Sequence, residues 1–88
     1  MLAKARIKKV WTMDRAREAV YGAVAKVTSV PIERLADRLT LRMLGVDHVA
    51  DNYPLRLEAG QIMRVNLDEK IGDMIERLTN VRTKIQHN

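Results

Sequence analysis

Apolar residues return every three or four positions along the first third of the chain. This spacing places them on one face of a helix and predicts an α-helix from about residue 13 to residue 28. Thr12 or Asp14 can cap its start. Pro31 ends the pattern, because the residue before a proline avoids the helical conformation. The apolar face consists of Ala16, Ala19, Val20, Ala23, Val24 and Val27.

A more regular apolar stripe runs through the C-terminal part of the chain. Steps of four and three residues separate Leu67, Ile71, Met74, Leu78, Val81 and Ile85. Asn66 and Glu69 resemble a capping box before this stripe. The pattern predicts a long helix that either packs within a helical bundle or forms a homodimer through a short coiled coil over residues 67–85.

The connection from 29 to 45 is rich in leucine but has no sustained period, so we expect an irregular segment lying over the core. A short helix over 31–39 is equally allowed, because proline is favoured in a first helical turn. Gly45 then interrupts the chain. Asp47 can cap a further helix that begins at His48.

The stretch from 48 to 66 fits two interpretations. Pro54 disfavours a helix interior, and Leu55-Arg56-Leu57 alternates as a strand does. The segment Ala59-Gly60 suggests a turn before a second short apolar run. We expect a helix here, with a hairpin over 55–66 as the alternative. The predicted fold is therefore an all-α bundle of three or four helices.

Charge divides the chain into a basic N-terminal arm, residues 1–12, and a single helical domain, residues 13–88. The arm carries no acidic residue, and the domain is nearly neutral. Most of the chain's net charge of +5 therefore belongs to the arm. Such an arm can attract phosphate or anionic lipid, or it can serve as a solvated leader. Its basic residues are Lys4, Arg6, Lys8 and Lys9.

The residue inventory argues against several functions. The absence of cysteine excludes disulfides and thiolate chemistry. No apolar run approaches the length of a membrane span, and the N-terminus has no signal-like apolar stretch, so we expect a cytoplasmic protein. His48 has no second histidine at a metal-ligand spacing, and no glycine-rich phosphate cradle is present. We therefore expect no metal, no cofactor and no enzymatic activity.

The segment from Val30 to Val49 resembles acyl carrier proteins. In that family a Gly-x-Asp-Ser-Leu motif presents the serine that receives 4'-phosphopantetheine, and here the motif becomes Gly45-Val46-Asp47-His48-Val49. His48 cannot form the phosphodiester, so the resemblance implies a carrier-like bundle without phosphopantetheine. The other positions that carry the resemblance are Val30, Glu33, Leu35, Leu41 and Leu44.

A carrier-like scaffold without its prosthetic group implies a protein-binding or regulatory subunit. Carrier proteins meet their partners at the start of the second helix, usually through carboxylates. Arg42, Arg56 and Arg64 dilute the acidic charge of that region here, so the resemblance implies changed partners. The partner-binding residues that it points to are Asp47, His48, Val49, Asp51 and Tyr53.

A small basic DNA-binding protein is the alternative. Residues 31–54 can be interpreted as a helix-turn-helix with Gly45 in the turn. The run from Ile62 to Leu67, followed by a helix, resembles the start of a ribbon-helix-helix repressor, whose paired strands enter the major groove. In either case Lys4, Arg6, Lys8 and Lys9 would contact phosphate.

Overall fold

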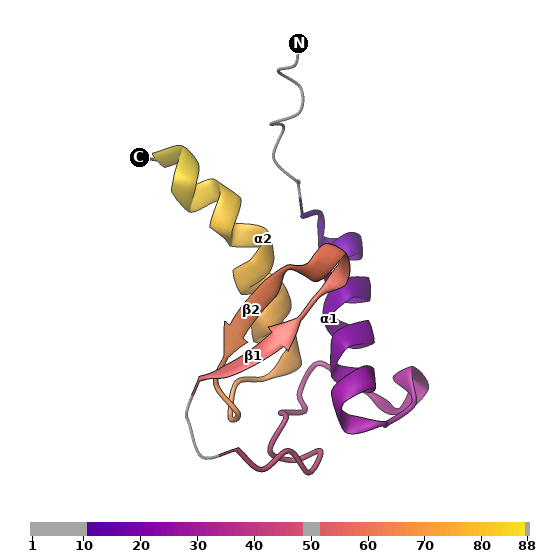
Figure 1. Ribbon diagram of the computed structural model, residues 1–88. Coiled ribbons are helices and arrows are strands. Elements are labelled where there is room, and N and C mark those ends of the chain that lie inside the picture. The colour runs from indigo at the N-terminus through magenta and orange to yellow at the C-terminus, as the bar shows by residue number, and fades with distance from the viewer. Residues whose placement is uncertain (1–10, 49–51, 88) are drawn as a thin grey trace.

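The part of the chain that the structure describes consists mainly of two α-helices and a β-hairpin (Figure 1). The computed structural model describes residues 11–48 and 52–87, and the side chains of these except 59 and 81–87. Helix α1 spans Met13–Thr28, strands β1 and β2 span Tyr53–Arg56 and Ile62–Val65, and helix α2 spans Ile71–His87. Two single turns of 3-10 helix, η2 (Ile32–Arg34) and η3 (Glu58–Gly60), lie between these elements. The helices contact each other, and the hairpin lies across them.

The predicted all-α bundle of three or four helices is wrong, because the described chain combines two α-helices with a two-stranded antiparallel sheet. The hairpin, held as the alternative, occupies the place expected for a helix. Pro54 removes a helical hydrogen bond but is compatible with an edge strand. Along both strands every second side chain is exposed, which a strand with one buried face requires.

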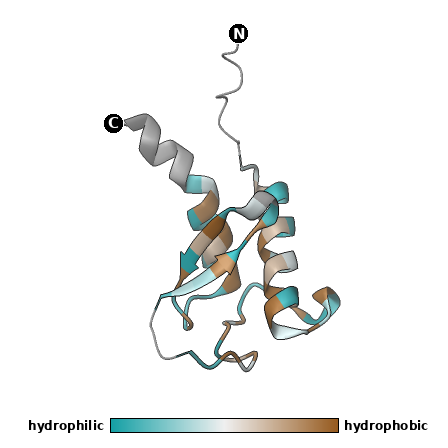
Figure 2. Cartoon of the chain, viewed as in Figure 1, coloured by the Kyte–Doolittle hydropathy of each residue, from teal (hydrophilic) through white to brown (hydrophobic). Residues whose placement is uncertain are grey.

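Strands β1 and β2 pair with Tyr53 opposite Val65 and Leu55 opposite Met63. These two pairs point toward the helices, where Leu55, Met63 and Val65 are buried. The hairpin closes through η3, where Gly60 adopts a φ of 75° and the Leu57 amide donates to the Gln61 carbonyl at 2.6 Å. Both strands carry hydrophobic as well as hydrophilic residues (Figure 2).

Helix α1 agrees closely with its predicted bounds. The Thr12 side chain accepts a hydrogen bond from the Arg15 amide at 3.2 Å, which identifies Thr12 as the N-cap. Ser29 ends the helix in the left-handed conformation. Trp11 was predicted to belong to the N-terminal arm, but its side chain is buried in the core and lies 5.3 Å from the Arg15 guanidinium.

Helix α2 begins at Ile71, five residues after the predicted cap. The Asn66–Glu69 contacts do form, but they close a turn that precedes the helix. The stripe predicted to mediate a coiled coil is buried within the chain's own core as far as Leu78. The side chains of Val81 and Ile85 lie outside the described residues. The stripe is therefore not available to a second copy from Leu67 to Leu78.

The segment from 29 to 48 crosses one end of the molecule without forming an α-helix. Its one helical element is the η2 turn, so the described residues 31–48 contain no pair of helices as a helix-turn-helix requires. Leu35 and Leu41 are buried against α1 and α2, which confirms that this connection lies over the core. Over the part of the chain that the structure describes, neither helix is long and apolar enough to cross a membrane.

Candidate protein-binding surface

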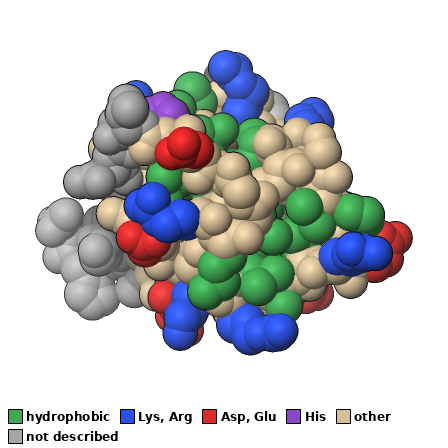
Figure 3. Space-filling model, turned by 90° about the horizontal axis from the view of Figure 1, so that it is seen from below, with side chains coloured by type: hydrophobic (Ala, Val, Ile, Leu, Met, Phe, Trp, Pro, Cys, Tyr) green, Lys and Arg blue, Asp and Glu red, His purple; other side chains and the backbone are tan. Residues whose placement is uncertain are grey.

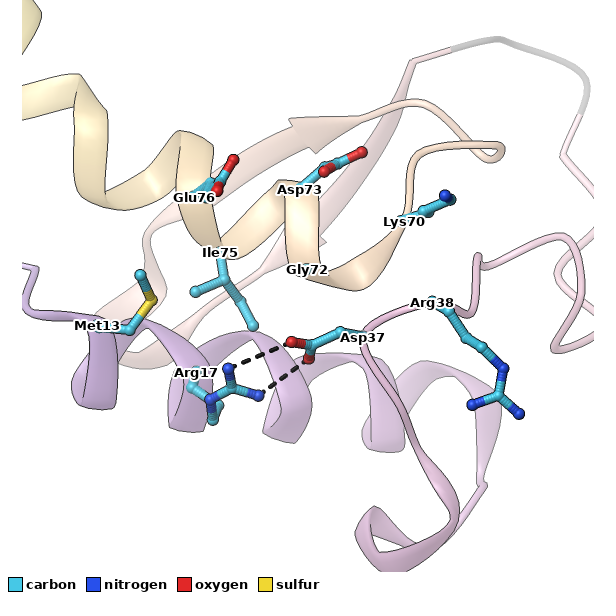
Figure 4. A pocket seen from close by; sticks show the side chains of 9 residues that line it. All are labelled: Met13, Arg17, Asp37, Arg38, Lys70, Gly72, Asp73, Ile75 and Glu76. Atoms are coloured by element: carbon cyan, nitrogen blue, oxygen red, sulfur yellow. Dashed lines mark hydrogen bonds and ion pairs between the residues drawn. The ribbon is translucent and has the colours of Figure 1, made fainter.

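Asp37 ties the segment 29–48 to helix α1. Its carboxylate accepts hydrogen bonds from the Arg17 guanidinium at 2.9 and 3.2 Å (Figure 4). It also accepts one from the Tyr21 hydroxyl at 2.5 Å. The hydrogen bonds from Tyr21 and Arg17 lower the pKa of Asp37. Burial and the same bond to Asp37 raise the pKa of Tyr21, and the pairing with Asp37 raises that of Arg17.

Backbone contacts tie the same segment to the start of α2. The amides of Ile71 and Gly72 donate to the carbonyls of Leu39 and Asp37, each at 2.9 Å. These bonds satisfy amides that a helix start would otherwise leave unpaired. A Cβ on Gly72 would lie 3.0 Å from the Cβ of Asp37, so the close approach depends on glycine. Thr40 and Lys70 add an isolated antiparallel bridge.

A tight turn over residues 40–46 completes the segment. Leu41 is fully buried and anchors the turn in the core. The Thr40 hydroxyl accepts from the Met43 amide at 3.1 Å, and the Val46 amide donates to the Leu41 carbonyl at 3.0 Å. Gly45 adopts a φ of 98°, a conformation that side chains other than glycine rarely tolerate. Hydrogen bonds and the buried Leu41 side chain therefore hold the backbone of the turn in one conformation.

This fixed segment nevertheless exposes large apolar side chains. Met43 is 68% exposed and Ile32 is 51% exposed, whereas their neighbours Leu41 and Leu35 are buried. Figure 3, which views this end of the molecule, shows groups of hydrophobic side chains among Lys, Arg, Asp and Glu side chains. We call this the loop surface, and define it by the exposed and half-buried residues Val30, Ile32, Leu39, Met43, Leu44 and Val46.

Two of the five residues predicted for partner binding are brought into contact. The rings of His48 and Tyr53 pack edge to face, with centroids 5.2 Å apart and planes at 90°. Asp47 is exposed beside His48. Val49 and Asp51 lie outside the described residues, as do Lys4, Arg6, Lys8 and Lys9 of the arm. The structure thus places Asp47, His48 and Tyr53 where the loop surface meets the start of β1.

Met43 and Ile32, the most exposed members of the loop surface, are not among the residues predicted for partner binding. They lie in the connection from 29 to 45, which as a whole is predicted to lie over the core. The available signal was position: Met43 lies between Leu41 and Leu44, and a tight turn cannot direct all three inward. Without knowledge of the turn, which of them faces solvent could not be inferred.

A hollow of about 410 Å³ lies beside Asp37, between α1 and the start of α2 (Figure 4). Arg17 and Asp37 neutralise each other at its floor. The remaining charges around it have both signs, since Arg38 and Lys70 stand opposite Asp73 and Glu76. Among the described residues, His, Asp and Glu nowhere gather in a group of three or more that could hold a metal ion. The hollow is therefore a place where α1, the connecting segment and α2 meet, and its lining charges do not favour a ligand of one sign.

Comparison of the chain with models of known protein families, with characterised proteins and with solved structures gave no match. The functional interpretation therefore depends on the geometry of the surfaces described above.

Proposed function

We propose that this protein is a small non-catalytic binding module that receives another protein on its loop surface. The observation that carries the proposal is the contrast within residues 40–46. The backbone is held by buried Leu41 and by specific hydrogen bonds, yet the Met43 side chain is 68% exposed. Apolar side chains displayed on a fixed backbone are typical of recognition surfaces, because little conformational entropy is lost on binding.

The chemistry of the loop surface also favours a protein as its partner. Unbranched methionine adapts to irregular apolar surfaces, and the loop surface adjoins the aromatic pair of His48 and Tyr53. Aromatic residues and methionine are enriched at protein interfaces. Asp47 and the charged side chains around the loop surface would form the polar rim of such an interface.

The departures from acyl carrier proteins support the absence of carrier chemistry. His48 replaces the serine that would accept the prosthetic group, and a hairpin stands where that family continues with its second helix. We propose that the module carries no phosphopantetheine. Incubation with coenzyme A and a permissive phosphopantetheinyl transferase should leave the intact mass unchanged. A gain of one phosphopantetheine would contradict this part of the proposal.

The binding role is tested by using the full chain as bait and measuring how much of a captured partner protein each variant retains. The variant Ile32→Asp/Met43→Asp places carboxylates on the loop surface, and we expect it to lose the captured partner at least tenfold because a charge cannot be buried in an apolar interface. Both positions are exposed, so the variant should keep the thermal midpoint of the wild type.

Ile62→Asp is the matched control, because Ile62 is also about half exposed but lies on the hairpin. It should capture the partner as the wild type does. Equal capture by all three proteins, or an equal loss from Ile62→Asp, would show that the loop surface is not the binding site.

A further inference from the structure

The hairpin has an outer face that the proposed protein-binding role does not use. In the register of β1 and β2, Pro54 lies opposite Arg64 and Arg56 lies opposite Ile62. All four side chains are exposed, because the alternate pairs point into the core. Asn52 and Asn66, which are also exposed, flank these pairs at the open end of the ribbon.

Positive charge on this face is not neutralised by neighbouring carboxylates. Ion pairs engage Arg15, Arg17, Arg42 and Arg77 elsewhere in the molecule. Within the described part of the chain, Arg56 and Arg64 have no such partner. The acidic residue closest along the ribbon is Glu58 at its tip, which is paired with Arg15.

We propose that the outer face of the β1–β2 hairpin binds double-stranded DNA. Two paired strands lie about 4.8 Å apart, and the major groove of B-form DNA, about 12 Å wide, admits such a ribbon. Arginine is the side chain that most often reads guanine there, and apolar side chains contact the methyl group of thymine. Arg56, Arg64 and Ile62 supply both kinds of contact from one face.

The helices behind the ribbon keep this face in a fixed shape. Leu55, Met63 and Val65 anchor the strands in the core, and the Arg77 guanidinium donates a hydrogen bond to the Arg64 carbonyl at 2.8 Å. The two arginines are therefore presented from an ordered backbone. The overall charge of +5 favours the approach of a polyanion.

Fluorescence anisotropy of the full chain with a short labelled B-form duplex, over a range of salt concentrations, tests the proposal. Each phosphate contact contributes about 0.9 to the slope of log affinity against log salt. The variant Arg56→Gln/Arg64→Gln should lower this slope by between 1 and 2 if the arginines contact phosphate, or weaken binding roughly tenfold per arginine if they read bases.

Arg34→Gln/Arg38→Gln is the matched control, because it removes the same charge from the segment 29–48 and leaves the ribbon intact. It should bind the duplex as the wild type does. The proposal is overturned if the wild type does not bind at low salt, or if both double variants lose the same affinity.

Two further measurements distinguish binding to DNA from binding to other polyanions. Duplex RNA should bind less tightly, because its major groove is too narrow for side chains to read. Equal binding to duplex RNA or to anionic vesicles would overturn a major-groove mode. The Ile32→Asp/Met43→Asp variant should keep full affinity for DNA, so failure of the loop-surface proposal and failure of this one are distinguishable.

Discussion

Asp37 connects the segment 29–48 to both helices. Its carboxylate joins Arg17 and Tyr21 of α1, and its carbonyl accepts from Gly72 at the start of α2. One residue of the connecting segment therefore holds both helices. Its side chain was not among the candidate residues of the sequence analysis, because nothing local indicates which helix an aspartate in a connection will contact.

Asp37→Asn should reduce the free energy of unfolding by about 1 kcal/mol at neutral pH. A charge-assisted hydrogen bond is worth about 1.5–3 kcal/mol, but the carboxylate of Asp37 is 46% exposed, so solvent screening reduces the effect. Because the folded state lowers the pKa of Asp37, the wild type loses this contribution as the pH falls below the unfolded value of 3.8. Urea unfolding from neutral to acidic pH measures both effects.

The control for this prediction is Asp47→Asn, which makes the same change at an exposed position of the same connecting segment. Its effect should stay within about 0.5 kcal/mol, as is usual for a surface substitution. If Asp37→Asn retained the full acid dependence of the wild type, the Arg17–Asp37–Tyr21 contacts would not contribute to stability.

At the scale of elements, α1 was predictable, whereas the helix expected in place of the hairpin was wrong. Sixteen residues of helical period leave little ambiguity, and the Thr12 cap lies next to them. Strands of four residues each are too short for a period of two to be distinguished from fragments of a helix. The element is settled by packing, because Leu55, Leu57, Met63 and Val65 all reach the helices from one face of the ribbon.

Two glycines predict opposite effects of the same substitution. Gly22 lies within α1, and a Cβ there would meet no atom within 4 Å, so Gly22→Ala should stabilise the protein by about 0.5–1 kcal/mol. Gly45 has a φ of 98°, so Gly45→Ala should destabilise it by about 1–2 kcal/mol. Thermal and urea unfolding of both variants provide the measurement, and each variant is the control for the other. Stabilisation by Gly45→Ala would contradict the turn over residues 40–46.

For the whole molecule, the main question is what covers the apolar stripe of α2. Within one chain, α1, the connecting segment and the hairpin cover it as far as Leu78. The stripe therefore builds a core that contains Ile71, Met74 and Ile75, each at most 1% exposed. A coiled-coil homodimer would have to remove these side chains from that core.

Leu78→Asp should accordingly unfold the chain and not merely separate two copies. A carboxylate at a side chain 6% exposed has no partner, and an unpaired buried charge exceeds what a domain of 88 residues can tolerate. Circular dichroism should show loss of helix, and light scattering should give the mass of one chain, 10.1 kDa, for the wild type. Asn80→Asp, which adds the same charge at an exposed position, should change neither. A folded Leu78→Asp monomer derived from a wild-type dimer would restore the coiled-coil interpretation.

The amino-acid order alone was enough to place the two helices and to show that the leucines of the connection lie over the core, because both follow from local period and apolar content. The tertiary structure was needed to show that residues 53–65 form a hairpin, that the stripe of α2 serves its own chain, and that Met43 is exposed while Leu41 is buried. These outcomes depend on contacts between segments far apart along the chain, and the burial gained in such contacts outweighs the weak preferences of short stretches.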